Sequence, residues 1–290
     1  MEKKLIGRGI IAGAFAGLLA FVFARVFAEP AINAAIAYGK GRDAAQAALD
    51  KAAGLPASAA DPDIFSRTVQ ANIGIGVGMI LFGAAMGAVF AVVYAVCLGR
   101  VGNLRPRVLA MLVAGAGFLG VYLVPFLKYP ANPPSIGHSE TIGARGALYL
   151  VMVLASIVLL VLAVLTGRRL QHPVGSWNAS LLAGAGFVVV IGIVMALLPP
   201  LGHLASNKAQ YGLHATETPL PLRDAKGAIV FPGFPADTLV TFRLYSVAAQ
   251  LLLWSVIGLV FGPMAERVLA PAAFAAARQR RRVGASGQLA

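Results

Sequence analysis

The stretch LIGRGIIAGAFAGLLAFVFARVFA, residues 5–28, decides the class of fold. A helix that crosses a bilayer needs about 20 predominantly apolar residues, and this longer run is interrupted only by Arg8 and Arg25. A cleavable signal peptide would have an apolar region of about 7–15 residues and a small-residue cleavage site. We therefore expect a retained helix that spans the membrane.

The composition of the whole chain supports this expectation. The sequence is 59% hydrophobic and only 12% charged, whereas soluble domains carry about 25% charged residues. So few charges cannot cover a water-facing surface, and we expect an integral membrane protein in the lipid bilayer. Nucleic-acid binding is not expected, because the net charge of +13 forms neither a basic face nor an alternation with aromatic residues.

Further apolar runs extend the pattern along the chain. Six stretches are long enough to span a bilayer: residues 5–28, 72–98, 108–127, 146–166, 179–201 and 238–261. The third run is the shortest, and five spans are the alternative. We predict an all-α polytopic membrane helix bundle in which residues 1–270 form a single transmembrane domain.

The basic residues predict how this bundle is oriented. In the six-span arrangement the side with both termini carries 13 Lys and Arg, and the other side carries 9 over much longer loops. The positive-inside rule then places both termini in the cytoplasm. Residues 30–71 and 202–236 become outer loops, and residues 271–290 become a basic, disordered cytoplasmic tail.

The first outer loop contains two helix-start signals. Asp43 is a candidate N-cap and Gly54 a candidate stop for a short extramembrane helix. Asp61 and Pro62 repeat the start signal for a helix that continues through Leu98.

Glycines recur at every fourth residue in the first two runs, as Gly9, Gly13 and Gly17 and as Gly83 and Gly87. This spacing lets helix backbones approach closely in lipid. It predicts a tightly packed bundle and leaves a homo-oligomer open.

Enzymatic motifs are not evident in the sequence. Gly115, Gly117 and Gly120 spell G-x-G-x-x-G but lie in the middle of an apolar run, without the strand and the acid that a dinucleotide site needs. No Walker loop, Ser/His/Asp set or paired carboxylates stand out. We therefore expect no catalytic residues and no enzyme.

Charged residues next to the spans are more informative, because burying a charge in a membrane is costly. Arg25 and Glu29 are one helical turn apart and could pair. Arg243 should face the bundle interior, pair with an acid such as Glu29 or Asp237, or extend to the headgroups. A structural ion pair and a role in a transport pathway both remain open for it.

The run 108–127 ends at FLKYPANPPSIG, residues 126–137. We call residues 128–134 the proline knot, which contains Lys128, Tyr129, Pro130, Asn132, Pro133 and Pro134. Prolines fix φ and lack an N–H, so the knot can simply stop a helix at the headgroup level. Alternatively, its carbonyl oxygens and the Asn132 side chain face a cation in a cavity. Lys128 opposes that reading, because an ammonium group repels a metal ion.

Several blocks of the sequence resemble the CbtA family of probable cobalt transporter subunits: VYLVPFLKYPANPPSIG, ETIGARGALYL, SWNASL and GFPADTLVTFRLYSVAAQLLLWSVIGLVFGPMAER. The resemblance implies a multi-pass protein of the bacterial inner membrane. It also implies a small histidine-bearing membrane partner, CbtB, and a supply of cobalt for cobalamin synthesis. Co²⁺ would be the transported ion, with no tightly bound cofactor.

The resemblance also implies positions of interest. Besides the knot, these are Thr141, Ile142, Asp237, Arg243, Gln250 and Glu266, with Glu29 from the first span. His138 and Ser139 depart from the family, which usually has an acidic residue and a proline there. Residues 202–231 look like an insertion.

Metal ligands are not spelled out locally, because no two histidines lie three or four residues apart. The candidates are Asn132, His138, Glu140, His203 and His214, and the alternative for each histidine is a solvated loop residue. We expect a subunit of a Co²⁺ uptake system. A permease for another solute such as Ni²⁺, or a non-transporting membrane scaffold, is the alternative.

Overall fold

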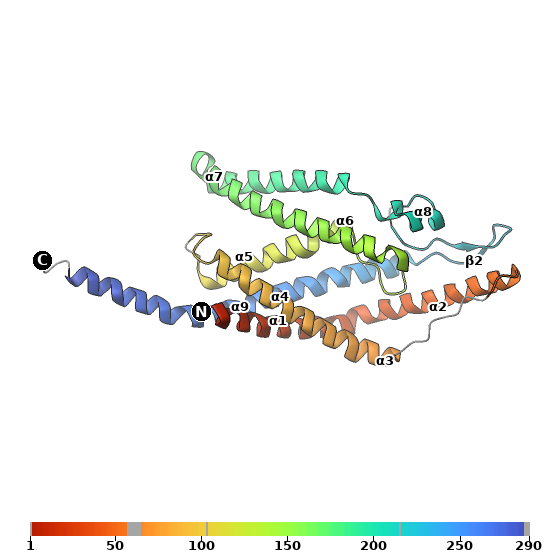
Figure 1. Ribbon diagram of the computed structural model, residues 1–290, viewed down its shortest axis with the longest axis horizontal. Coiled ribbons are helices and arrows are strands. Elements are labelled where there is room, and N and C mark those ends of the chain that lie inside the picture. The colour runs from red at the N-terminus through yellow and green to blue at the C-terminus, as the bar shows by residue number, and fades with distance from the viewer. Residues whose placement is uncertain (1, 57–64, 103, 215, 287–290) are drawn as a thin grey trace. The chain divides into compact units, whose positions relative to one another are not determined.

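The computed structural model describes residues 2–56, 65–102, 104–214 and 216–286, and helices dominate it (Figure 1). Five of the described segments are helical, long and apolar enough to cross a membrane: Glu2–Ala52, Arg67–Cys97, Pro106–Lys128, Ser139–His203 and Ala236–Ala270. The predicted helical class is confirmed. The described residues also contain two short antiparallel strands, β1 (Leu222–Arg223) and β2 (Ile229–Phe231).

One of the five segments contains two of the predicted apolar runs. Helix α7 (Ile142–Leu197) includes Pro173 and has a non-helical bend at Gly175, with φ 78° and ψ 162°. Its two arms pack on one another, since Met152 of the first arm and Ile191 of the second lie in one apolar core. Figure 1 shows the chain folding back at this bend. Counted as helical segments there are five, and the six-span topology stays a prediction.

The first segment is longer than predicted. Helix α1 (Glu2–Phe23), a π-helical turn (Ala24–Ala28) and α2 (Glu29–Ala52) follow one another without a break. Asp43 lies inside α2, so the prediction of an N-cap there is wrong, because the alanine-rich sequence on both sides favours uninterrupted helix. The predicted stop is confirmed, since Gly54 follows the helix end with φ +73°.

The second and third segments agree closely with the sequence prediction. The second comprises α3 (Arg67–Val69), a π-helical turn (Gln70–Gly74) and α4 (Ile75–Cys97). The third comprises α5 (Pro106–Gly117), another π-helical turn (Phe118–Leu123) and α6 (Val124–Lys128). The predicted start at Asp61 and Pro62 lies outside the described residues.

The remaining elements differ from the predicted loop and tail. Residues 202–236 contain, besides the strands, the short helix α8 (Ala205–Tyr211). Short 3-10 turns precede α7 (Ser139–Thr141) and α8 (Leu201–His203). Helix α9 (Ala236–Ser286) continues past Pro271, where a disordered tail is expected, because the alanine-rich residues that follow are strong helix formers.

The chain divides into two compact units, each built from separate parts of the sequence. The first unit comprises residues 1–23, 67–117 and 249–290, and the second comprises residues 24–66 and 118–248.

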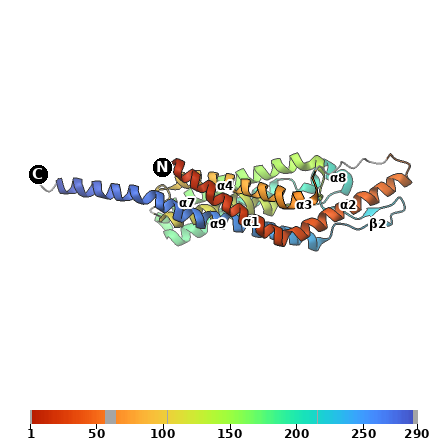
Figure 2. The same ribbon diagram turned by 90° about the horizontal axis from the view of Figure 1, so that it is seen from below.

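A glycine seam joins α1 and α4 in the first unit, where Figures 1 and 2 show the two helices side by side. A Cβ atom built on Gly13 would lie 2.0 Å from the Gly83 carbonyl oxygen, and one on Gly9 would lie 2.2 Å from that of Gly87. The predicted close packing through small residues is confirmed.

Aromatic residues complete the core of the first unit. The Phe261 ring lies edge-on against Phe90 and Tyr94, with centroid distances of 5.1 and 4.9 Å. Glu266, one of the positions taken from the family resemblance, forms an ion pair with Arg107 at 2.7 Å. Helix α9 is thereby fixed to the start of α5.

In the second unit, α2 packs against the strand β2 and the residues that follow it. The Tyr38 ring centroid lies 5.3 Å from that of Phe231 and 5.0 Å from that of Phe234, and its hydroxyl donates to the Pro232 carbonyl at 2.9 Å. Figure 2 shows α2 running beside β2. Residues 24–52 thus form a helical support for the loop 202–236.

Candidate functional site

The proline knot follows α6 and is held firmly by its neighbours. The Tyr129 side chain is buried, and its hydroxyl donates to the Pro199 carbonyl at 2.8 Å. Burial raises the pKa of Tyr129, so the hydroxyl keeps its proton and remains a donor. Pro133 is also buried, and its carbonyl accepts from the Ile136 N–H at 3.2 Å. The backbone between Lys128 and Pro134 is therefore anchored at both ends.

The ammonium group of Lys128 lies near the aromatic ring of the next residue. Its Nζ lies 5.7 Å from the centroid of the Tyr129 ring, within the range of a cation–π contact. Pro134 is exposed and Pro130 half-buried.

Arg243, about two turns into α9, binds the knot directly. Its Nη2 donates to Asn132 Oδ1 at 2.9 Å and its Nε donates to the Ala131 carbonyl at 3.2 Å. Within the described part of the chain, no ion pair joins Arg243 to Glu29 or Asp237. Two of the oxygens that the sequence suggested for a cation, the Ala131 carbonyl and Asn132 Oδ1, are therefore bonded to the guanidinium of the same chain.

A second polar cluster surrounds Glu217, which the sequence analysis did not single out. The Glu217 side chain is fully buried, at 0% exposure. Its Oε2 lies 2.9 Å from Arg145 Nη1, and its Oε1 accepts from Asn207 Nδ2 at 3.1 Å and from the Thr141 hydroxyl. Thr141 and Asn207 are themselves buried. The Glu217 cluster, formed by these four residues, ties the segment after α8 to the start of α7.

Sequence reasoning missed Glu217 because it lies in the segment that resembled an insertion. One signal was available, since it is a lone acid in the proline-containing stretch HATETPLP, and an acid there needs a partner if that loop packs. Thr141 and Arg145 both belong to the block ETIGARG. The presumed insertion is thus bonded to a block that carries the family resemblance.

The candidate metal ligands are not gathered around one point. Among the described residues, no three His, Cys, Asp or Glu side chains form a group that could hold a metal ion. Glu140 is exposed and accepts from the Ser206 hydroxyl at 2.8 Å, and His203 is exposed. His214 lies beside the same turn as His203, because a Cβ on Gly202 would lie 0.8 Å from the His214 carbonyl oxygen.

His138 borders the Glu217 cluster. Its carbonyl accepts from the Thr141 hydroxyl at 2.9 Å, and its ring centroid lies 5.3 Å from that of Tyr211. Its Nε2 is buried and has no hydrogen-bond partner among the described residues. Of the predicted ligands, His138 alone has a buried side-chain nitrogen that is not hydrogen-bonded to any described residue.

Three other candidates occupy separate places. Glu29 is buried at 5% exposure where α2 begins, and Asp237 is exposed in the first turn of α9.

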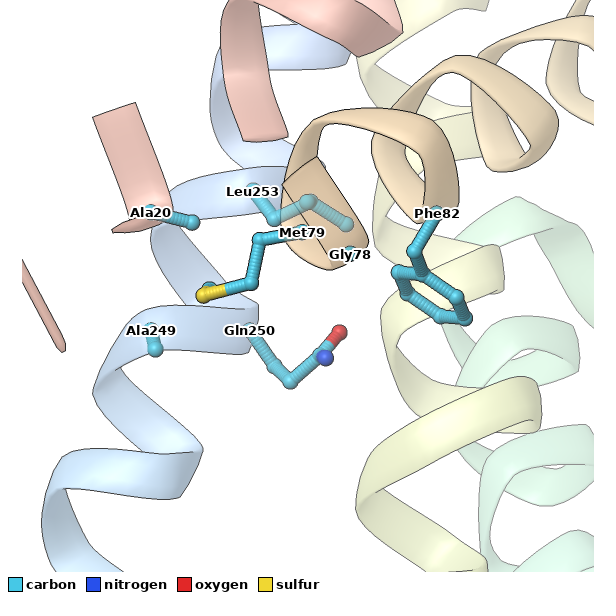
Figure 3. A pocket seen from close by; sticks show the side chains of 7 residues that line it. All are labelled: Ala20, Gly78, Met79, Phe82, Ala249, Gln250 and Leu253. Carbon is cyan, nitrogen blue, oxygen red and sulfur yellow. The ribbon is translucent and has the colours of Figure 1, made fainter. Parts of the chain in front are cut away.

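Gln250 lines a cavity of about 120 Å³ in the first unit, together with Ala20, Gly78, Met79, Phe82, Ala249 and Leu253. Figure 3 shows its amide pointing into the space bordered by Met79 and Phe82. It is the polar side chain of an otherwise apolar lining.

A family model described as "Probable cobalt transporter subunit (CbtA)" matches residues 2–266. The chain belongs to the CbtA family. No curated protein and no solved structure matches it in the corresponding searches.

Membership of the CbtA family gives the site its context. The matched residues include the proline knot, the Glu217 cluster and Gln250. A CbtA protein is a probable transporter subunit, which is not a class of enzyme, and the five apolar helical segments fit a membrane protein. The word subunit also implies a partner in a complex.

Proposed function

We propose that this chain is the main membrane subunit of a bacterial inner-membrane system that takes up Co²⁺ and supplies it to cobalamin synthesis. It works with a small CbtB-like membrane protein whose histidines help to capture the ion. The observation that carries the proposal is the contact of Arg243 with the Ala131 carbonyl and with Asn132 Oδ1. These two oxygens hold a positive charge without help from any acid in the described residues.

The proposed topology has six spans with both termini in the cytoplasm. The fold-back of α7 at Gly175 supports two spans in that helix, and the basic loops at residues 99–107 and 167–178 contain no acid. The knot then lies at the outer end of the third span. A dication that enters down the membrane potential gains about 4.6 kcal/mol per 100 mV.

The donor chemistry of the knot suits the proposed ion. Carbonyl and amide oxygens favour a partly hydrated, hexacoordinate divalent ion more than a soft, thiolate-loving one. The single cysteine, Cys97, cannot supply a thiolate cluster within one chain. Asn132 is the proposed ligand, and the further candidates are His138, Glu140, His203 and His214. The proposed pathway also includes Glu29, Thr141 and Asp237.

Uptake of labelled cobalt by cells tests this proposal. Cells that express the chain with a CbtB-like partner should accumulate more cobalt than empty cells. A matching gain for Ni²⁺ would instead indicate a broader metal permease. No gain of any metal, with or without the partner, would contradict metal uptake and leave a permease for another kind of solute or a non-transporting scaffold.

Replacing Asn132 by alanine should reduce cobalt uptake at least about fivefold, because one good oxygen ligand contributes about 1 kcal/mol or more to holding the ion. Asn178→Ala is the control, since Asn178 is exposed and, among the described residues, its side chain bonds only to the Val174 carbonyl across the bend of α7, at 3.1 Å. Uptake is measured at equal amounts of membrane-inserted protein. Equal uptake by the two variants would mean that the knot only ends the helix and does not bind the ion.

Gln250→Leu should also lower cobalt uptake several-fold while leaving thermal stability unchanged within about 1 kcal/mol. The change removes the polar group of the cavity, and none of the described residues loses a hydrogen bond to it. Met79→Leu, a volume-conserving change in the same lining, should leave uptake unaltered. If both variants transport normally, the cavity has no part in the pathway.

A further inference from the structure

Among the residues that the structure describes, no acid pairs with Arg243 where it binds the knot. Its guanidinium donates to two neutral oxygens, the Ala131 carbonyl and Asn132 Oδ1. Asp237, the acid nearest in sequence, is exposed in the first turn of the same helix, and no ion pair joins it to Arg243 within the described residues. A buried or half-buried arginine is ordinarily paired with a carboxylate. The arrangement is instead that of a cation held by oxygen dipoles.

The two oxygens are positioned by contacts that do not involve Arg243. Tyr129 is bonded to the Pro199 carbonyl on one side of them, and Pro133 is buried and bonded to Ile136 on the other. Ser135 has φ +65°, and α2 packs closely there, because a Cβ on Gly39 would lie 2.8 Å from Ser135 Cβ. Since prolines also fix the backbone, the acceptors should stay in place when the guanidinium leaves.

A metal ion and the guanidinium cannot share these oxygens. Both are cations, and at contact distance in a partly desolvated site their repulsion is strong. The arginine side chain is long and its guanidinium is weakly hydrated, so it can withdraw while the helix remains in place.

We infer that Ala131 O and Asn132 Oδ1 form a binding site for a divalent cation, and that Arg243 is its resident, tethered occupant. An arriving cation must displace Arg243, so this residue sets how strongly the knot competes for metal. The inference rests on the proposed function for the identity of the ion as Co²⁺. The existence of the cation site does not depend on transport.

Calorimetric titration of CoCl₂ into the purified full chain in detergent tests the inference. Arg243→Gln, which removes the charge, should bind Co²⁺ at least tenfold more tightly than the unmodified chain. The double variant R243Q/N132A should lose that gain. Arg243→Lys keeps a positive charge at the site and should bind no better than the unmodified chain.

The variants distinguish two roles of Arg243: occupying a cation site, or only holding α9 against the knot. If Arg243 only braced α9 against the knot, R243Q and R243K would lower stability together and neither would bind Co²⁺ more tightly. Should R243Q fail to fold, Arg243→Met carries the same expectation of tighter, Asn132-dependent binding. Binding that does not tighten, or that tightens equally without Asn132, overturns the inference.

The failure of this inference differs from the failure of the proposed function. If R243Q gains Co²⁺ binding but cells take up no cobalt, the cation site stands and the uptake proposal falls. If cells take up cobalt but R243Q gains no affinity, the inference alone falls.

Discussion

Glu217→Gln should lower the free energy of unfolding by about 3 kcal/mol, because it leaves the Arg145 guanidinium beside a buried group that no longer carries charge. Breaking one partner of a buried pair typically costs about 3–5 kcal/mol, and the lower end applies since the Arg145 side chain is 28% exposed. Thr141 and Asn207 also donate to this carboxylate. The variant should melt about 6 °C or more below the unmodified chain in detergent.

Glu140→Gln is the matched control for this prediction. Glu140 lies in the turn just before α7, but its carboxylate is exposed and accepts from the Ser206 hydroxyl at 2.8 Å. Exposed interactions of this kind contribute little, so its melting temperature should change by less than about 2 °C. Equal shifts for the two glutamine variants would show that the Glu217 cluster does not hold the segment 202–221 in place.

Gly13→Val should be strongly damaging to the first unit. A Cβ at this position would lie 2.0 Å from the Gly83 carbonyl oxygen and 2.8 Å from Gly87 Cα. These are backbone atoms of α4, so the two helices must separate and lose their contact. Overpacking usually costs about 1–3 kcal/mol and sometimes more, and we expect about 3 kcal/mol or above here. Thermal melting followed by circular dichroism measures it.

Gly78→Ala provides the control on the same helix pair. Gly78 lies in α4, but a Cβ there meets nothing within 4 Å. Alanine is the better helix former, so the melting temperature should stay equal or rise. A Gly13→Val protein as stable as Gly78→Ala would mean that α1 and α4 do not pack through the glycine seam.

The sequence predicted the elements of the fold more reliably than their connections. Apolar length alone located the five long apolar helical segments of the described residues, because the bilayer imposes that length. The continuous helix through Asp43 was missed because a local capping signal was weighed above the alanine-rich residues around it. The strands β1 and β2 carry only five residues between them, too few for a periodic pattern.

For the candidate site, too, the sequence predicted single residues but not the contacts between them. The knot and Arg243 were both singled out from their chemistry, but their bond joins residues 111 apart in the chain, and no local pattern encodes such a pair. The contact between Thr141 and Glu217 spans 76 residues and was missed altogether. The sequence also offered an acid, Glu29 or Asp237, as a partner of Arg243, whereas the structure pairs Arg243 with neutral oxygens.

The most direct test of the central claim is cobalt entry into vesicles that contain only this chain and a CbtB-like partner. Labelled Co²⁺ is added outside, and a potential, negative inside, is imposed. We expect accumulation that rises with the potential, as a dication requires, and that falls at least about fivefold with Asn132→Ala, the loss of one good ligand. Accumulation no greater than in protein-free vesicles at every potential would contradict the account.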